Sequence, residues 1–119
     1  MARVLLECIT MVGNEYVLWD REGPSFPRGE LGEGEPPAEA ARRLVAEWTG
    51  TKTPKLELVD LLAQPGALVL VFRAMLVEEP KGVALRAKRM ELPERVGSLT
   101  GKYVEEALKT SLNYKLTRA

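Results

Sequence analysis

The sequence contains no histidine and only one cysteine, Cys8, among its 119 residues. The lack of histidine excludes a histidine general base. Together with the single cysteine, it also excludes a Cys/His zinc site and an intramolecular disulfide. Catalysis by this chain would therefore depend on carboxylates, lysine, arginine, tyrosine or a metal ion held by carboxylates. The spacing of the acidic residues is for that reason the main chemical signal in the sequence.

The sequence also lacks long apolar runs and an excess of charge of either sign. No segment approaches the roughly 18 apolar residues of a membrane-spanning helix, and the N-terminus lacks a signal-peptide pattern. Seventeen basic residues balance seventeen acidic ones, so the formal net charge of zero gives no general attraction to nucleic acid or to anionic membranes. We therefore expect a cytoplasmic protein whose partners are small molecules or other proteins.

The remaining composition is ordinary for one globular domain covering residues 1–119, with 45% hydrophobic and 29% charged residues. Two pairs of strand-like segments flank turn-forming residues and predict hairpins: 3–12 with 15–21 across Gly13-Asn14, and 55–62 with 67–77 across Pro65-Gly66. In the first hairpin, Tyr16 and Trp19 are expected to pack on opposite faces of their strand.

Two segments have the pattern of amphipathic helices. After Pro36-Pro37, apolar residues recur with the i, i+3, i+4, i+7 spacing of one helical face: Ala41, Leu44, Val45 and Trp48. A helix is therefore predicted at about 36–49, after a Gly- and Pro-rich loop at 23–36. A second helix is predicted at about 100–112, with Thr100 as its N-cap, and a further strand at 83–92. This order of elements is that of an α+β domain or a mixed-sheet sandwich.

The segment from Gly29 to Thr51 resembles the Nudix box. That motif consists of a glycine, five residues, a glutamate, seven residues, Arg-Glu, an aliphatic residue, any residue, two glutamates, any residue and a glycine. The matching positions are Gly29, Glu35, Arg43, Val45, Glu47 and Gly50. The resemblance implies a Nudix-like α/β/α sandwich with a mixed central sheet over nearly the whole chain. It also implies that Gly29, Glu35, Arg43 and Gly50 shape the loop and the helix.

Two of the three helix glutamates of the box are replaced. The family hydrolyses nucleoside diphosphates linked to another group, with Mg²⁺ or Mn²⁺ held by these glutamates, and this chain has Leu44 and Trp48 at two of their positions. At about 100° per residue, positions 44, 47 and 48 lie close together on a helix. Mg²⁺ needs several hard oxygen ligands in a fixed geometry, and only Glu47 remains. Glu47 is therefore the candidate catalytic and metal-binding residue of a box with weak or lost activity.

Other side chains could supply the missing functions. Glu78 or Glu79 could join Glu47 as a metal ligand, because the family often adds an acidic residue from a later loop, although both also fit a solvated surface. Arg28 stands where the family commonly has glycine, and its guanidinium could contact a phosphate in place of a metal ion. Trp48 could either pack in the core or line a pocket for a ligand.

Three functions are compatible with these features. The first is a binding or regulatory module for a nucleotide or nucleotide-sugar. The second is an active hydrolase that uses Mg²⁺ or Mn²⁺ in a rearranged site. The third is a non-catalytic subunit that contacts a protein partner or forms a homodimer.

Overall fold

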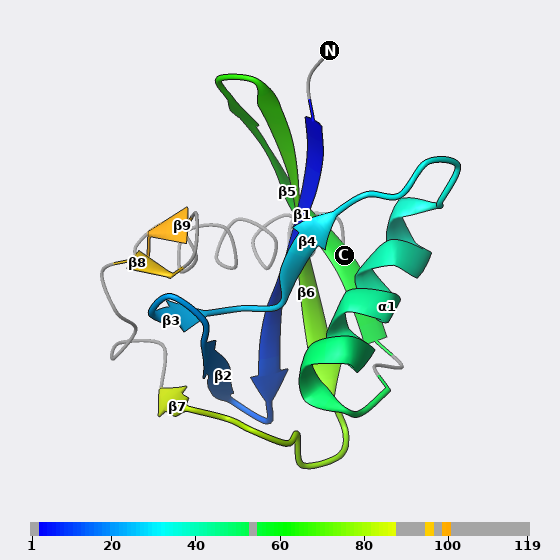
Figure 1. Ribbon diagram of the computed structural model, residues 1–119. Coiled ribbons are helices and arrows are strands. Elements are labelled where there is room, and N and C mark those ends of the chain that lie inside the picture. Colours follow the sequence, from blue (N-terminus) through cyan, green and yellow to red (C-terminus); the bar gives the residue numbers. More distant parts are fainter. Residues whose placement is uncertain (1–2, 53–54, 88–94, 97–98, 101–119) are drawn as a thin grey trace, which may run out of the picture.

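The described part of the chain forms a seven-stranded mixed β-sheet with a helix along one side, and a separate two-stranded sheet (Figure 1). The structure is a computed structural model that describes residues 3–52, 55–87, 95–96 and 99–100. Its elements are β1 (Arg3–Val12), β2 (Glu15–Asp20), β3 (Pro24–Ser25), β4 (Arg28–Glu30), α1 (Pro37–Thr49), β5 (Lys55–Gln64), β6 (Ala67–Leu76), β7 (Leu85–Ala87), β8 (Arg95–Val96) and β9 (Leu99–Thr100).

β1 is the central strand of the sheet. It pairs in parallel with β6 along its whole length, and β5 continues the sheet beyond β6 as its antiparallel hairpin partner. On its other side, β1 pairs antiparallel with β4 over Leu5–Glu7 and with β2 near its C-terminal end. The chain therefore returns to the middle of the sheet after β2 and β3, and this return places β4 next to α1.

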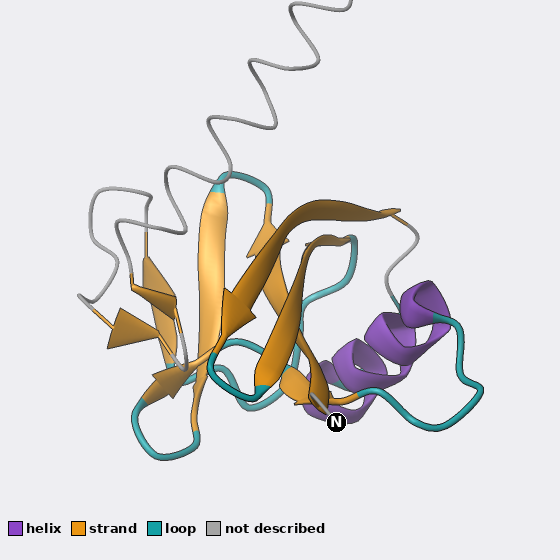
Figure 2. Ribbon diagram, turned by 90° about the horizontal axis from the view of Figure 1, so that it is seen from above, coloured by secondary structure: helices purple, strands orange, loops and turns teal. Residues whose placement is uncertain are grey.

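The apolar side chains divide between the two faces of the sheet. On the α1 side, Leu6, Trp19 and Phe72 pack with the apolar stripe of the helix. On the other face, Tyr16 and Phe26 belong to a second buried cluster. Seen from above in Figure 2, α1 lies along one side of the strands. The prediction that Tyr16 and Trp19 pack on opposite faces of β2 is confirmed.

α1 begins and ends as its sequence predicts. Pro36 is extended at φ −61° and ψ 137°, and Pro37 follows in the first turn, where its missing N–H needs no helical partner. At the other end, Gly50 adopts φ 71°, and its N–H donates to the carbonyl of Ala46 at 2.9 Å. The predicted helix at about 36–49 and its buried stripe are confirmed, as is the α+β class.

Two predicted elements differ from the structure, and a third lies mostly outside the described residues. The segment 23–36 is not wholly a loop, because it contains β3 and β4. Thr100 is the last residue of β9, and the rest of the predicted helix at 100–112 lies outside the described residues, so the prediction that Thr100 caps this helix stays untested. Of the predicted strand 83–92, only Leu85–Ala87 is a strand, and 88–92 also lies outside the described residues. Among the described residues, no helix is long and apolar enough to cross a membrane.

Candidate functional site

The loop before α1 is held to the helix by an ion pair between two residues of the box. Arg43 donates to the carboxylate of Glu35 from Nε at 2.9 Å and from Nη2 at 3.0 Å. The same carboxylate accepts the N–H of Gly32 at 3.2 Å. A two-point bond between planar groups restricts the position of both side chains. The pair thus joins the loop before α1 to the helix, and the structural role that the resemblance implies for Glu35 and Arg43 stays a prediction.

This ion pair predicts an acid-sensitive contribution to stability. The hydrogen bond from Arg43 lowers the pKa of Glu35 below its ordinary value of 4.5. Because the folded-state pKa is depressed, the stabilisation is fully present above that ordinary value and is lost as the pH falls through the folded-state pKa. We expect Glu35→Gln to lower the free energy of unfolding at neutral pH and to flatten its decline in acid, as measured by urea unfolding across pH.

The matched control for this prediction is Glu39→Gln. Glu39 is also an acidic residue near the start of α1, and it is exposed. Its replacement should change the free energy of unfolding at neutral pH by only about 0.5 kcal/mol, as surface substitutions usually do. An unchanged acid slope in Glu35→Gln would show that the pair with Arg43 contributes nothing to the fold.

Leu44 and Trp48, at the positions of two expected glutamates, are buried. Leu44 is 4% exposed and lies over Gly29 of β4. Trp48 is 9% exposed and meets the ring of Trp19 edge to face, with ring centroids 6.4 Å apart. Two of the three positions of α1 that would carry the box carboxylates are therefore part of the packing between the helix and the sheet.

The contact between Leu44 and Gly29 predicts a coupled pair of mutations. A Cβ atom at position 29 would lie only 2.5 Å from Cδ2 of Leu44. Overpacking a filled core costs about 1–3 kcal/mol, so Gly29→Ala should lower the free energy of unfolding by that amount. In a Leu44→Ala background the same change should cost much less, because the clashing methyl group is gone. Urea unfolding of the four proteins measures the coupling, and an equal cost in both backgrounds would contradict this packing.

Glu47, the remaining helix carboxylate, is exposed and accepts a hydrogen bond from Nη1 of Arg43 at 3.4 Å. Glu79 forms an ion pair with Arg86, and Glu78 is exposed. Over the described ranges, no three His, Cys, Asp or Glu side chains gather into a group that could hold a metal ion. Counting only residues that the structure describes, the donor set around Glu47 does not fit Mg²⁺ or Mn²⁺. The metal-binding roles of Glu47, Glu78 and Glu79 stay predictions.

Cys8 is also an unsuitable nucleophile. Its side chain is fully buried in the core between the sheet and α1. Burial raises the pKa of its thiol to about 12. Because the thiolate is the reactive form, this cysteine is inert at neutral pH.

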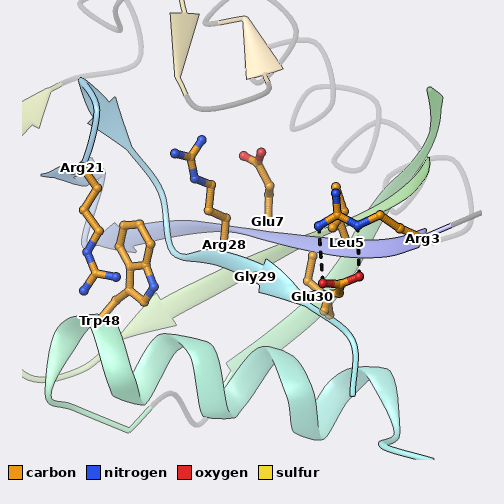
Figure 3. Close-up of a pocket in the computed structure, with 9 residues that line it drawn as sticks. Arg3, Leu5, Glu7, Arg21, Arg28, Gly29, Glu30 and Trp48 are labelled. Atoms are coloured by element: carbon orange, nitrogen blue, oxygen red, sulfur yellow. Dashed lines mark hydrogen bonds and ion pairs between the residues drawn. The ribbon is translucent and has the colours of Figure 1, made fainter. Parts of the chain in front are cut away.

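A pocket of about 450 Å³ lies over β1 and β4 beside the C-terminal part of α1 (Figure 3). The charged and aromatic side chains that line it come from four parts of the chain: Arg3 and Glu7 of β1, Arg28 and Glu30 of β4, Arg21 after β2, and Trp48 of α1. Arg28 and Trp48, the two residues predicted to bind a ligand, therefore line one pocket. Trp48 both packs in the core and lines this pocket.

The charged groups of the pocket have different surroundings. Arg3 and Glu30 neutralise one another through two contacts, at 3.0 and 3.3 Å (dashed in Figure 3). Arg28 lies opposite Glu7 in the register of β1 and β4, and its guanidinium is 3.8 Å from the carboxylate of Glu22, which is highly exposed. Exposed ion pairs at such distances contribute little to the free energy of folding. Arg28 thus remains suited to bind an anion.

Arg21 was not identified from the sequence. The carbon of its guanidinium lies 3.8 Å from the ring centroid of Trp48, so the two groups stack at the edge of the pocket (Figure 3). Arg21 and Trp48 are far apart in the sequence and belong to no common motif, so no spacing could reveal the contact. Glu7 was also missed, although a glutamate inside the apolar run of β1 is a visible signal.

Comparisons with known proteins agree with this architecture. No protein-family model matches the sequence, and no curated protein matches it. Among solved structures, the chain is similar to a Nudix hydrolase from Nitrosomonas europaea, with a TM-score of 0.74 and 17% identity over 91% of this chain and 70% of that one.

Two further structures show the same likeness. An ADP compounds hydrolase has a TM-score of 0.74 and 18% identity, over 97% of this chain and 75% of that one. A Bacillus subtilis pyrophosphohydrolase has a TM-score of 0.62 and 23% identity, over 96% of this chain and 80% of that one. At these identities the likeness concerns the fold.

Proposed function

The chain has the Nudix fold, and on this premise we propose that it is a binding or regulatory module for a nucleotide-type ligand, with weak or lost pyrophosphohydrolase activity. The observation that carries the proposal is the burial of Leu44 and Trp48. Both side chains fill space between α1 and the sheet at positions where the box has glutamates.

The chemistry of pyrophosphate cleavage supports the loss of turnover. The reaction needs positive charge on the phosphate oxygens and a water activated by a metal ion or a base. The sequence offers no histidine for the base. Glu47 is hydrogen-bonded to Arg43, and the described residues place no metal-ligand group around it. A lone exposed carboxylate gives a metal ion little fixed geometry.

The pocket supports the retention of ligand binding. Its volume of about 450 Å³ is within the usual range for small-molecule sites. Arginine binds phosphate oxygens through a planar set of donors, and Arg21 and Arg28 both line the pocket. Two of the similar structures are named as an ADP compounds hydrolase and a pyrophosphohydrolase. A phosphate-bearing nucleotide is the ligand class that these features share.

The experiment that tests the proposal combines binding with product analysis. The protein would be titrated by calorimetry with AMP, ADP and ADP-ribose, and the same mixtures analysed by chromatography. Binding without products supports the module. Products that require Mg²⁺ or Mn²⁺ and disappear in Glu47→Gln would instead establish the rearranged hydrolase. An absence of binding by every nucleotide would remove the proposal.

A second candidate, protein contact, is favoured by an apolar surface on β5. Leu58 and Leu61 are 53% and 52% exposed, and the bulge between Leu58 and Asp60 brings both to the same face of the strand. Exposed leucines on an outer strand can mark an interface. Light scattering over a range of concentrations tests self-association. If the protein forms a homodimer through this surface, the double variant Leu58→Gln with Leu61→Gln should have the mass of the monomer.

A further inference from the structure

The Arg21–Trp48 stack is built on a fixed support. The ring of Trp19 meets that of Trp48 at an interplanar angle of 87°, and its indole N–H donates to the carbonyl of Lys81 at 2.9 Å. Trp48 is thus held from the side of the core, and its pocket side carries the guanidinium of Arg21. An aromatic ring held in this way gives the arginine a defined position and reduces the entropy that it loses on binding a ligand.

The backbone of Arg21 is also anchored. Its N–H donates to the carbonyl of Gly23 at 3.1 Å, and its carbonyl accepts the hydroxyl of Ser25 at 3.0 Å. Ser25 is buried, so the turn after β2 has a fixed connection to the sheet. Arg21 is therefore restrained at both its main chain and its guanidinium.

The charge of Arg21 is available to a ligand. In the part of the chain that the structure describes, Arg21 takes part in none of the observed ion pairs. Stacking on an indole uses the face of a guanidinium and leaves the N–H groups at its edge free to donate. A phosphate can accept from two of these N–H groups at once.

We propose that Arg21, presented on the ring of Trp48, is a phosphate-binding residue of the pocket and that it binds the phosphate directly, without a divalent cation. This inference rests on the proposed function and specifies how that site works. The substitution that removes a carboxylate at position 48 also supplies the ring that seats Arg21. A glutamate at position 48 would be a metal ligand, whereas the tryptophan at this position supports the guanidinium of Arg21. The ligand class is a phosphate ester that carries its charge near Trp48, such as a nucleoside monophosphate.

The test compares AMP with adenosine, which differ only in the phosphate, by calorimetry in EDTA. The wild type should bind AMP more tightly than adenosine, with the same AMP affinity when Mg²⁺ replaces EDTA. Arg21→Gln should lower the AMP affinity about tenfold to a hundredfold, the range for a charged hydrogen bond, and leave the adenosine affinity unchanged. Arg21→Lys should recover only part of the loss, because an ammonium lacks the planar pair of donors.

The matched control is Arg42→Gln, which removes the same charge from an exposed position of α1. It should bind AMP as the wild type does, and circular dichroism should show that both variants are folded. Loss of AMP binding in Arg42→Gln to the same extent would mean that only the overall charge matters, which overturns the inference. An unchanged AMP affinity in Arg21→Gln, or a requirement for Mg²⁺, would overturn it while leaving the proposed function intact. A wild type that binds no nucleotide would overturn both.

Discussion

Trp48→Ala is expected to lower the free energy of unfolding by about 3–5 kcal/mol, the usual cost of removing a large aromatic side chain from a core. Trp48 is 9% exposed, and its ring contacts both the ring of Trp19 and the guanidinium of Arg21. The edge-to-face contact contributes about 0.5–1.5 kcal/mol beyond the burial of area, and a cation over the ring about 0.5–1 kcal/mol more. Urea unfolding followed by far-UV circular dichroism measures the loss without relying on the fluorescence of the deleted ring.

Two variants at and beside this position serve as controls. Trp48→Phe keeps an aromatic ring against Trp19 and should cost clearly less than Trp48→Ala. Glu47→Ala removes a side chain from the neighbouring exposed position and should change the free energy of unfolding by only about 0.5 kcal/mol, as surface substitutions usually do. A loss for Trp48→Ala as small as that for Glu47→Ala would show that this ring does not support the core.

Restoring both box glutamates, with Leu44→Glu and Trp48→Glu, is expected to unfold the domain rather than to restore a metal site. From the sequence alone, this double change should create affinity for a divalent cation, unless Trp48 is buried and a carboxylate there unfolds the domain instead. In the structure, however, Leu44 lies against Gly29, and Trp48 lies against Trp19. A carboxylate at position 44 leaves a buried charge without a partner, which costs several kcal/mol, and Trp48→Glu adds the loss of a large aromatic side chain from the core. That sum is comparable to the whole stability of a typical domain, about 5–15 kcal/mol.

The expected result is a loss of the β-sheet signal in circular dichroism at room temperature, with or without Mn²⁺. The matched control is Ala38→Glu with Ala46→Glu, which adds the same two charges at exposed positions of α1 and should remain folded. A folded Leu44→Glu, Trp48→Glu protein whose melting temperature rises on addition of Mn²⁺ would contradict this account. It would show that positions 44 and 48 can still hold metal ligands and that their apolar side chains are not required for the core.

Local patterns were sufficient to predict the elements whose residues carry their own signals. The spacing of Leu44 and Trp48 identified the buried face of α1, and Gly50 marked its end. The turns at Gly13-Asn14 and Pro65-Gly66 identified two hairpins, of which the first pairs only next to its turn and the second along its whole length. In each case the physical cause is a preference expressed within a few residues, so a single sequence reveals it.

Features that depend on distant contacts could not be predicted in this way. Arg28, Gly29 and Glu30 have the composition of a loop, yet they form β4 because β1 offers them backbone partners. Gly29 was assigned to shaping the loop, whereas the structure shows it making room for Leu44.

The position of Arg21 over Trp48 depends on where the turn after β2 meets the helix. The sheet fixes the position of this turn relative to α1, and no sequence motif encodes that position. The resemblance to the Nudix box indicated where chemistry would be located, and the packing of the two replaced positions supports the loss of that chemistry.

The most direct test of the central claim is a calorimetric titration of the wild-type protein with ADP-ribose, first in EDTA and then in Mn²⁺, followed by chromatography of the cell contents. The account predicts binding with the same Kd in both buffers and no AMP above the level in protein-free buffer. Binding that requires Mn²⁺, with AMP formed in proportion to the protein present, would contradict it.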